Sequence, residues 1–178
     1  MAGNPPLVYL DACIFIAAIT GERRKGDEAQ HVAGVMAELE QRELIAVTSA
    51  LTRGEILECT LTDQQRNVME RLLRPPKLQI KDVSSPILSV ATEIRNFYQK
   101  QKLDGVTNLP TVELPDAIHL ATAIYFECPT MFTFDENDRP EPKSRPKRGL
   151  IPLSGIIADR YELEIVKPFS KMTGLALC

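Results

Sequence analysis

The feature that most constrains the fold is the alternation of short apolar runs with segments whose apolar residues recur at helical spacing. The runs are LVYL at 7–10, LIAVT at 44–48, LQI at 78–80, MFTF at 131–134 and LEIVKPF at 163–169. Each is short enough for a buried strand, and helical patterns separate most of them. Strands that alternate with helices form parallel sheets covered on both faces. The sequence therefore predicts an α/β fold with a doubly wound, mainly parallel central sheet.

The expected helices begin and end at recognisable signals. Ser49 is a plausible N-cap for a helix through about Cys59, and TDQQ at 62–65 resembles a capping box. Pro75 and Pro76 should stop the second of these helices. Further helices are expected over residues 14–19, from 32 to about 42, from Ser85-Pro86 through 98, and from Leu114 onward.

The length and composition fit one compact domain over residues 1–178. A chain of 178 residues with 44% hydrophobic residues can bury a core without disulfides or structural metal. Residues 136–149 differ from the rest, because three prolines and five basic residues occur there with almost no aliphatic residue. We expect a Pro-rich basic surface loop at this place, and a short tail after the last strand.

Charge and cysteine usage exclude several classes of protein. The net charge of −3 does not favour the sequence-independent phosphate binding of strongly basic proteins. The four cysteines form no CxxC pair and no cysteine-histidine cluster, so neither zinc nor a disulfide framework is expected. The longest apolar stretch near the N-terminus contains Asp11 and is too short to span a bilayer. We expect a cytoplasmic protein.

Three aspartates should meet at one edge of the sheet. Asp11 follows the first strand, Asp135 follows MFT, and Asp116 lies in the first turn of its helix. In a parallel sheet the carboxyl ends of strands and the N-termini of the following helices share one edge, where ligands bind. Glu55 lies about 9 Å along its helix at about 1.5 Å per residue, so its place at this edge is the least determined.

Carboxylates this close together repel one another unless a cation lies between them. Oxygen ligands without histidine or cysteine favour Mg²⁺ or Mn²⁺. Such ions orient a phosphate and activate water for phosphodiester hydrolysis. The pattern thus predicts Asp11, Glu55, Asp116 and Asp135 as catalytic and metal-binding residues.

Each acid also has an ordinary explanation when taken alone. Asp11 could cap a helix, Asp116 could favour the helix dipole, and Asp135 in DEND could belong to a turn. Glu55 could lie on a solvated helix face. His119, one turn after Asp116, is interpreted as a structural residue of a packed helix.

Four ordered blocks resemble the PIN-domain family of ribonucleases, over about residues 7–138. VYLDACIFIAAI, TSALTRGEILE, LPDAIHLATAI and MFTFDEND are similar to the segments that carry the family's four acids. The resemblance implies cleavage of single-stranded RNA with Mg²⁺ or Mn²⁺, and it assigns Asp11, Glu55, Asp116 and Asp135 to the metal site. It further implies a supporting hydroxyl at Thr133 and an additional acid at Asp138.

Many small bacterial members of this family are VapC-type toxins, which are usually homodimers inhibited by an antitoxin. The resemblance therefore implies a homodimer and an antitoxin partner, for which the apolar helices near Met36 and Met69 are candidate surfaces. This chain differs from the compact toxins by its basic loop and by its length after Asp138. The loop bases are candidate RNA-binding residues that would guide phosphates past the acids: Lys143, Arg145, Lys147 and Arg148.

The spacing of the acids does not fit two other families that use aspartates at strand ends. A phosphatase of the haloacid dehalogenase type needs a second aspartate two positions after the first, where this chain has Cys13. A receiver domain needs an acidic pair near the first strand, and none is present. A PIN-like module that binds RNA or protein without cleaving it remains the alternative, although a pure binder gains nothing from concentrated negative charge.

Overall fold

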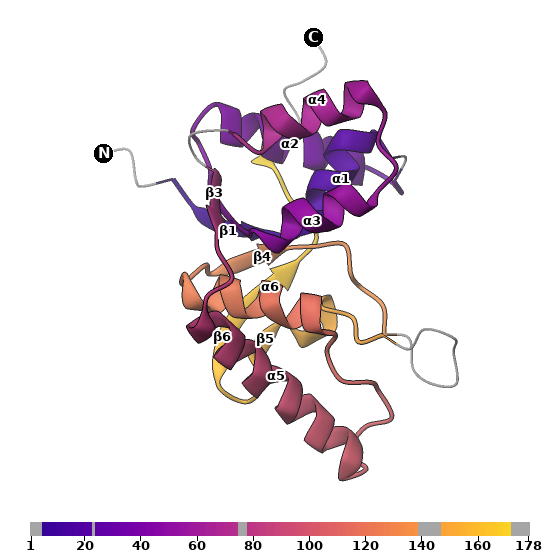
Figure 1. The fold of residues 1–178 in the computed structure, drawn as a ribbon, viewed down its shortest axis with the longest axis vertical. Helices are drawn as coiled ribbons and strands as arrows, with labels where there is room; N and C mark the ends of the chain where they lie inside the picture. The colour runs from indigo at the N-terminus through magenta and orange to yellow at the C-terminus, as the bar shows by residue number, and fades with distance from the viewer. Residues whose placement is uncertain (1–4, 23, 75–77, 139–146, 172–178) are drawn as a thin grey trace.

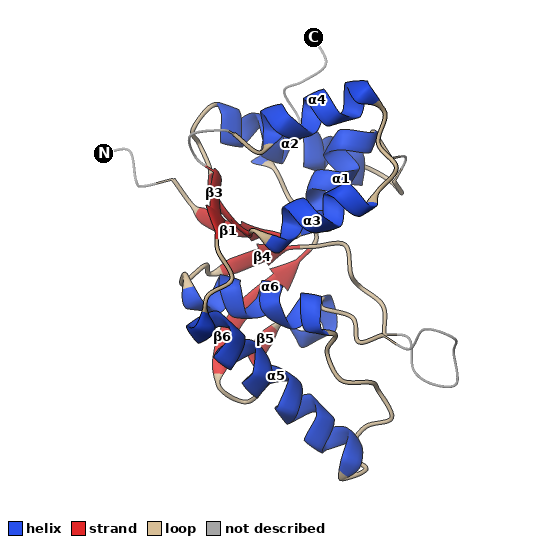
Figure 2. Cartoon of the chain, in the orientation of Figure 1, coloured by secondary structure: helices blue, strands red, loops and turns tan. Residues whose placement is uncertain are grey.

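The computed structural model describes residues 5–22, 24–74, 78–138 and 147–171, which form a six-stranded sheet (Figure 2). The strand order is β3-β2-β1-β4-β6-β5. Strands β1 to β4 and β6 pair in parallel, and β5 pairs antiparallel with β6. The strands are β1 (Leu7–Leu10), β2 (Ile45–Ser49), β3 (Leu78–Lys81), β4 (Thr130–Phe132), β5 (Gly155–Ile157) and β6 (Tyr161–Val166).

Helices cover both faces of the sheet, as the sequence predicted (Figure 1). One face carries α1 (Ala12–Thr20), α2 (Glu28–Glu40), α3 (Leu51–Glu58) and α4 (Asp63–Leu72). The other face carries α5 (Ser85–Leu103) and α6 (Leu114–Tyr125), together with the short 3₁₀ helix η1 (Ile151–Leu153). Within the described ranges, no helix is both long and apolar enough to cross a membrane.

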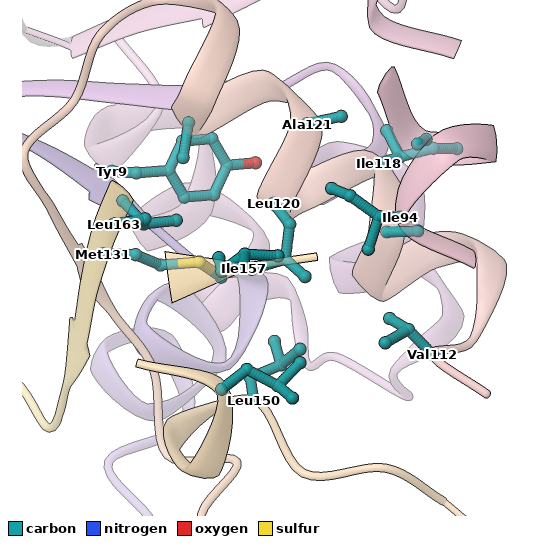
Figure 3. Packing of buried hydrophobic residues seen from close by; sticks show 14 of the residues in the cluster. Tyr9, Ile94, Val112, Ile118, Leu120, Ala121, Met131, Leu150, Ile157 and Leu163 are labelled. Carbon is teal, nitrogen blue, oxygen red and sulfur yellow. The ribbon is translucent and has the colours of Figure 1, made fainter. Parts of the chain in front are cut away.

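The alternation of side chains along β1 divides the core into two layers. Val8 and Leu10 face the layer under α1 to α4, whereas Tyr9 faces the layer under α5 and α6. Figure 3 shows Tyr9 beside Leu163 and Met131, with its hydroxyl oxygen turned toward the side of the cluster where Ala121 lies. Because successive residues of a strand point to opposite faces, one central strand contributes to both cores.

The helix signals were mostly confirmed. Thr62 and Gln65 form the expected capping box at α4, and Pro86 lies in the first turn of α5. The assignment of Ser49 as an N-cap was wrong. Ser49 is the last residue of β2 and Ala50 is the cap residue of α3, although the Ser49 hydroxyl still accepts a hydrogen bond from the Leu51 N–H at 3.1 Å. Pro75 and Pro76 lie outside the described residues.

The C-terminal strands differ from expectation. The last parallel strand begins at Tyr161 and ends at Val166, and β5, which the sequence pattern did not predict, pairs with its edge. With only three residues and the exposed Ile156 at its centre, β5 gives too short a pattern to be recognised. The chain turns between these strands through Ala158 and Asp159, both at positive φ.

Candidate active site

The site lies where the strand order reverses, between β1 and β4. From β1 the chain proceeds outward to β2 and β3, and it returns to the other side of β1 with β4. Asp11 directly follows β1 and its N–H donates to the Phe132 carbonyl at 3.1 Å, while Thr133 directly follows β4. Such a reversal leaves a crevice at the carboxyl ends of the strands, where α/β proteins bind ligands.

The Asp11 carboxylate is held by three donors. Its Oδ1 accepts the Ala12 N–H at 2.7 Å, and its Oδ2 accepts the Thr133 hydroxyl at 2.6 Å and the Cys13 thiol at 3.1 Å. Burial, together with the neighbouring Asp11 charge, raises the pKa of Cys13 well above its usual value, so the thiol keeps its proton and donates. Asp11 therefore caps α1 and also presents a fixed carboxylate at the site.

Glu55 is held near Asp11 by His119, whose Nε2 lies between the two carboxylates. The Glu55 Oε2 lies 2.8 Å from His119 Nε2, and Asp11 Oδ1 lies 3.8 Å from the same nitrogen. Since a carboxylate only accepts, Nε2 must carry a proton. In the neutral imidazole Nδ1 is then an acceptor, and it receives the Tyr9 hydroxyl at 2.6 Å.

The Tyr9 hydroxyl is fixed in turn by the Ser49 N–H, which donates to it at 3.0 Å. Ser49, Tyr9 and His119 are at most 1% exposed, so these hydrogen bonds are shielded from water as far as Glu55, whose side chain is 26% exposed. Burial lowers the pKa of His119, but the hydrogen bond to Glu55 and the charge of Asp11 outweigh it, and the pKa is raised. The arrangement holds Glu55 in one orientation.

Asp116 and Asp135 form a second pair around a lysine. Lys147 Nζ lies 3.4 Å from Asp116 Oδ2 and 3.0 Å from Asp135 Oδ2. Burial of Asp116 raises its pKa from 3.8 to about 7; Lys147 opposes this shift, and the charges of Asp135 and Asp11 add to it. Burial lowers the pKa of Lys147, but the two carboxylates outweigh it and the pKa is raised.

Asp138 contacts the returning end of the basic loop, at the two residues that follow Lys147. Its Oδ1 accepts the Gly149 N–H at 2.9 Å and lies 3.9 Å from Arg148 Nε. The Arg148 guanidinium lies over the Tyr98 ring, 5.0 Å from its centroid. Asp138 thus holds the segment after β4 against the chain that returns at Arg148 and Gly149.

The structure brings Asp11, Glu55, Asp116 and Asp135 to one edge, as the sequence reasoning expected of them. Thr133 supports Asp11 directly and also accepts the Asp135 N–H at 3.1 Å. Lys143 and Arg145 lie outside the described residues. Lys147 contacts Asp135 and Arg148 contacts Asp138, with side chains that are 20% and 13% exposed. The role of these two bases in RNA binding stays a prediction.

The sequence did not indicate that the side chains of Cys13, His119 and Lys147 contact the acids. His119 was expected to be buried, which is correct, but its bond to Glu55 was not anticipated. Its spacing of three residues from Asp116 places both on one face of α6, and this was the available signal. Lys147 was expected only as one of the RNA-binding bases. Its contact with Asp116 and Asp135 had no signal in the sequence, because Lys147 lies at the end of a loop whose path the local sequence does not determine.

The carboxylate oxygens of the four acids are ligands that suit a hard divalent metal ion, but they are not already arranged around one point. Over the described ranges, no three histidine, cysteine, aspartate or glutamate side chains converge closely enough to hold a metal. The acids form two pairs instead, around His119 Nε2 and Lys147 Nζ. Asp116 Oδ2 is buried, and in the described part of the chain it is paired with a cation, the Lys147 ammonium at 3.4 Å. Buried carboxylate oxygens of this kind fit a hard divalent cation.

Comparison with known proteins agrees with this fold. A crystal structure of VapC20 from Mycobacterium tuberculosis, a toxin that cleaves the sarcin-ricin loop, superposes with a TM-score of 0.50 at 11% identity, covering 73% of this chain and 91% of that one. VapBC2 from Rickettsia felis, bound to a DNA fragment from its promoter, gives a TM-score of 0.47 at 15% identity, covering 71% and 86%. No curated protein sequence matches the chain. The PIN domain model matches residues 8–139, which is well over half of the sequence, and the chain therefore belongs to the PIN domain family.

Proposed function

We propose that this protein is a metal-dependent ribonuclease that hydrolyses phosphodiester bonds of single-stranded RNA. The observation that carries the proposal is the gathering of Asp11, Glu55, Asp116 and Asp135 at the strand-order reversal of a PIN domain. Membership in the family and the likeness to the fold of VapC20 support it. Mg²⁺ or Mn²⁺ is the ion that carboxylate ligands favour.

The roles of the residues follow from their contacts. A divalent ion held by Asp11, Glu55, Asp116 and Asp135 would supply the Lewis acidity and charge that phosphodiester hydrolysis needs. Thr133 and the Ala12 N–H fix Asp11, and His119 fixes Glu55. With the Glu55 and Asp11 oxygens held in place, less reorganisation is needed when substrate phosphate enters.

The decisive experiment is a cleavage assay on single-stranded RNA with Mn²⁺. Asp11→Asn and Asp116→Asn each keep the side-chain size and remove a charge, so cleavage should fall by at least about 100-fold while the circular dichroism spectrum is preserved. Asp104→Asn, at the exposed end of α5, is the matched control and should cleave as the parent does. Absence of cleavage by the parent, together with RNA binding, would instead favour the silent binding module.

The partners belong to the same proposal. We infer that the chain forms a homodimer and is inhibited by an antitoxin protein, as the family resemblance implies. Met36 and Met69 are themselves buried between α1, α2 and α4, so an interface near them would use the outer surfaces of α2 and α4. Sedimentation showing a monomer at micromolar concentration would contradict the dimer. Harmless expression in a bacterial host without any partner would contradict the toxin role.

A further inference from the structure

Lys147 holds a position that a cation would otherwise hold in the carboxylate cluster of Asp11, Glu55, Asp116 and Asp135. Its ammonium lies between Asp116 Oδ2 and Asp135 Oδ2, at 3.4 and 3.0 Å. The two carboxylates come from different elements, the first turn of α6 and the segment after β4. The Lys147 ammonium therefore links the start of α6 to the segment after β4 through its two ion pairs.

The lysine is a built part of the site rather than a mobile surface chain. Its side chain is 20% exposed, whereas that of Lys167, which also bridges two carboxylates, is 41% exposed. Lysine is seldom buried to this degree unless it is paired. Such a side chain gives up rotamer freedom on folding, so the two ion pairs must compensate for it.

The backbone around Lys147 is fixed against the strand end that carries Asp135. The N–H groups of Leu150 and Ile151 both donate to the Asp135 carbonyl at 2.9 Å. A Cβ on Gly149 would lie 2.9 Å from the backbone carbon of Asn137, so only glycine permits the close approach seen here. With the chain held on its C-terminal side, the Lys147 ammonium is delivered to one place.

An ammonium and a metal ion cannot share this place. A divalent ion held by Asp116 and Asp135 through these oxygens would compete with the Lys147 ammonium for them. Two-metal nucleases use two ions about 3.5 to 4 Å apart. Asp11 and Glu55 contact His119 rather than Lys147. The one ion of the proposed function would be held on their side of the cluster, by Asp11, Glu55 and the oxygens of Asp116 and Asp135 that Lys147 does not contact.

We propose that Lys147 is the second cation of this site, so that the protein binds one divalent ion where a two-metal arrangement would bind two. This inference rests on the proposed metal-dependent function. It also changes the expected role of the loop: Lys147 would stabilise negative charge at the reacting phosphate from within the acidic cluster, instead of guiding RNA from outside.

The test is the number of Mn²⁺ ions bound per chain, measured by equilibrium dialysis and isothermal titration calorimetry. We expect one ion in the parent and two in Lys147→Met, with magnetic coupling between the two Mn²⁺ ions visible by electron paramagnetic resonance. Lys147→Arg keeps the charge and should bind one. Lys167→Met removes a lysine that bridges Glu28 and Glu136, neither of which is one of the four acids, and this variant should also bind one.

The outcomes separate this inference from the proposed function. Two ions in the parent would overturn the role of Lys147, whether or not any variant folds. One ion in both the parent and a folded Lys147→Met protein would overturn it as well, while leaving the metal-dependent function intact. If the parent binds no Mn²⁺ at saturation, the proposed function fails and this inference fails with it.

Discussion

Replacing Asp116 by asparagine should abolish cleavage and, in the absence of metal, make the fold more stable at alkaline pH. Asp116 is buried beside Asp135 and Asp11, and burial raises its pKa from 3.8 to about 7. An acid with a raised pKa in the folded state binds more protons there than in the unfolded chain. The preferential protonation of Asp116 therefore stabilises the folded state fully below pH 3.8, and this stabilisation is lost as the pH rises to about 7.

The magnitude follows from the difference between the two pKa values. A difference of about three corresponds to about 4 kcal/mol at full ionisation, with about 2 to 3 kcal/mol of it lost between pH 5 and pH 8. The asparagine side chain does not ionise, so the Asp116→Asn variant should exceed the parent by about 2 to 4 kcal/mol at pH 8. For a chain of this size that is a rise in Tm of about 5 to 10 °C.

Urea unfolding in EDTA, at pH 5 and pH 8, measures this effect directly. Asp138→Asn is the control: it removes an acid that meets Arg148 and the Gly149 N–H, so the variant should lose stability. Saturating Mn²⁺ should raise the Tm of the parent far more than that of Asp116→Asn. An Asp116→Asn protein that is less stable than the parent at pH 8 in EDTA would refute the reasoning, as would an unchanged difference in stability between pH 5 and pH 8.

Three further outcomes are expected. Mn²⁺ binding at pH 6 should release close to one proton, because Asp116 is mainly protonated in the metal-free protein. Calorimetry in two buffers of different ionisation enthalpy measures this release. A binding enthalpy that is the same in both buffers would contradict it. Tyr9→Phe removes the hydroxyl between the Ser49 N–H and His119, and should cost about 2 to 4 kcal/mol in urea unfolding; a loss below about 0.5 kcal/mol would exclude the chain of bonds. Gly149→Ala should lower the free energy of unfolding by about 1 to 3 kcal/mol, since its Cβ would meet the backbone of Asn137, and an unchanged Tm would show that the segment has room.

The sequence alone determined the layered architecture and the position of three acids. Alternating strand and helix patterns lead to a parallel sheet, and Asp11, Asp116 and Asp135 each lie within a few residues of a strand end or a helix start. In such a sheet these places share one edge by topology. Local position therefore sufficed, and no knowledge of side-chain packing was needed.

The tertiary structure decided the rest of the site. Glu55 lies well inside α3, so its approach to Asp11 depends on how α3 and α6 pack and on His119 between them. Lys147 reaches the cluster because a loop returns to the end of β4, and loop paths are set by contacts distant in the sequence. Periodicity reports which face of an element is buried, but not which polar side chains from separate elements meet, because that depends on the relative placement of the elements.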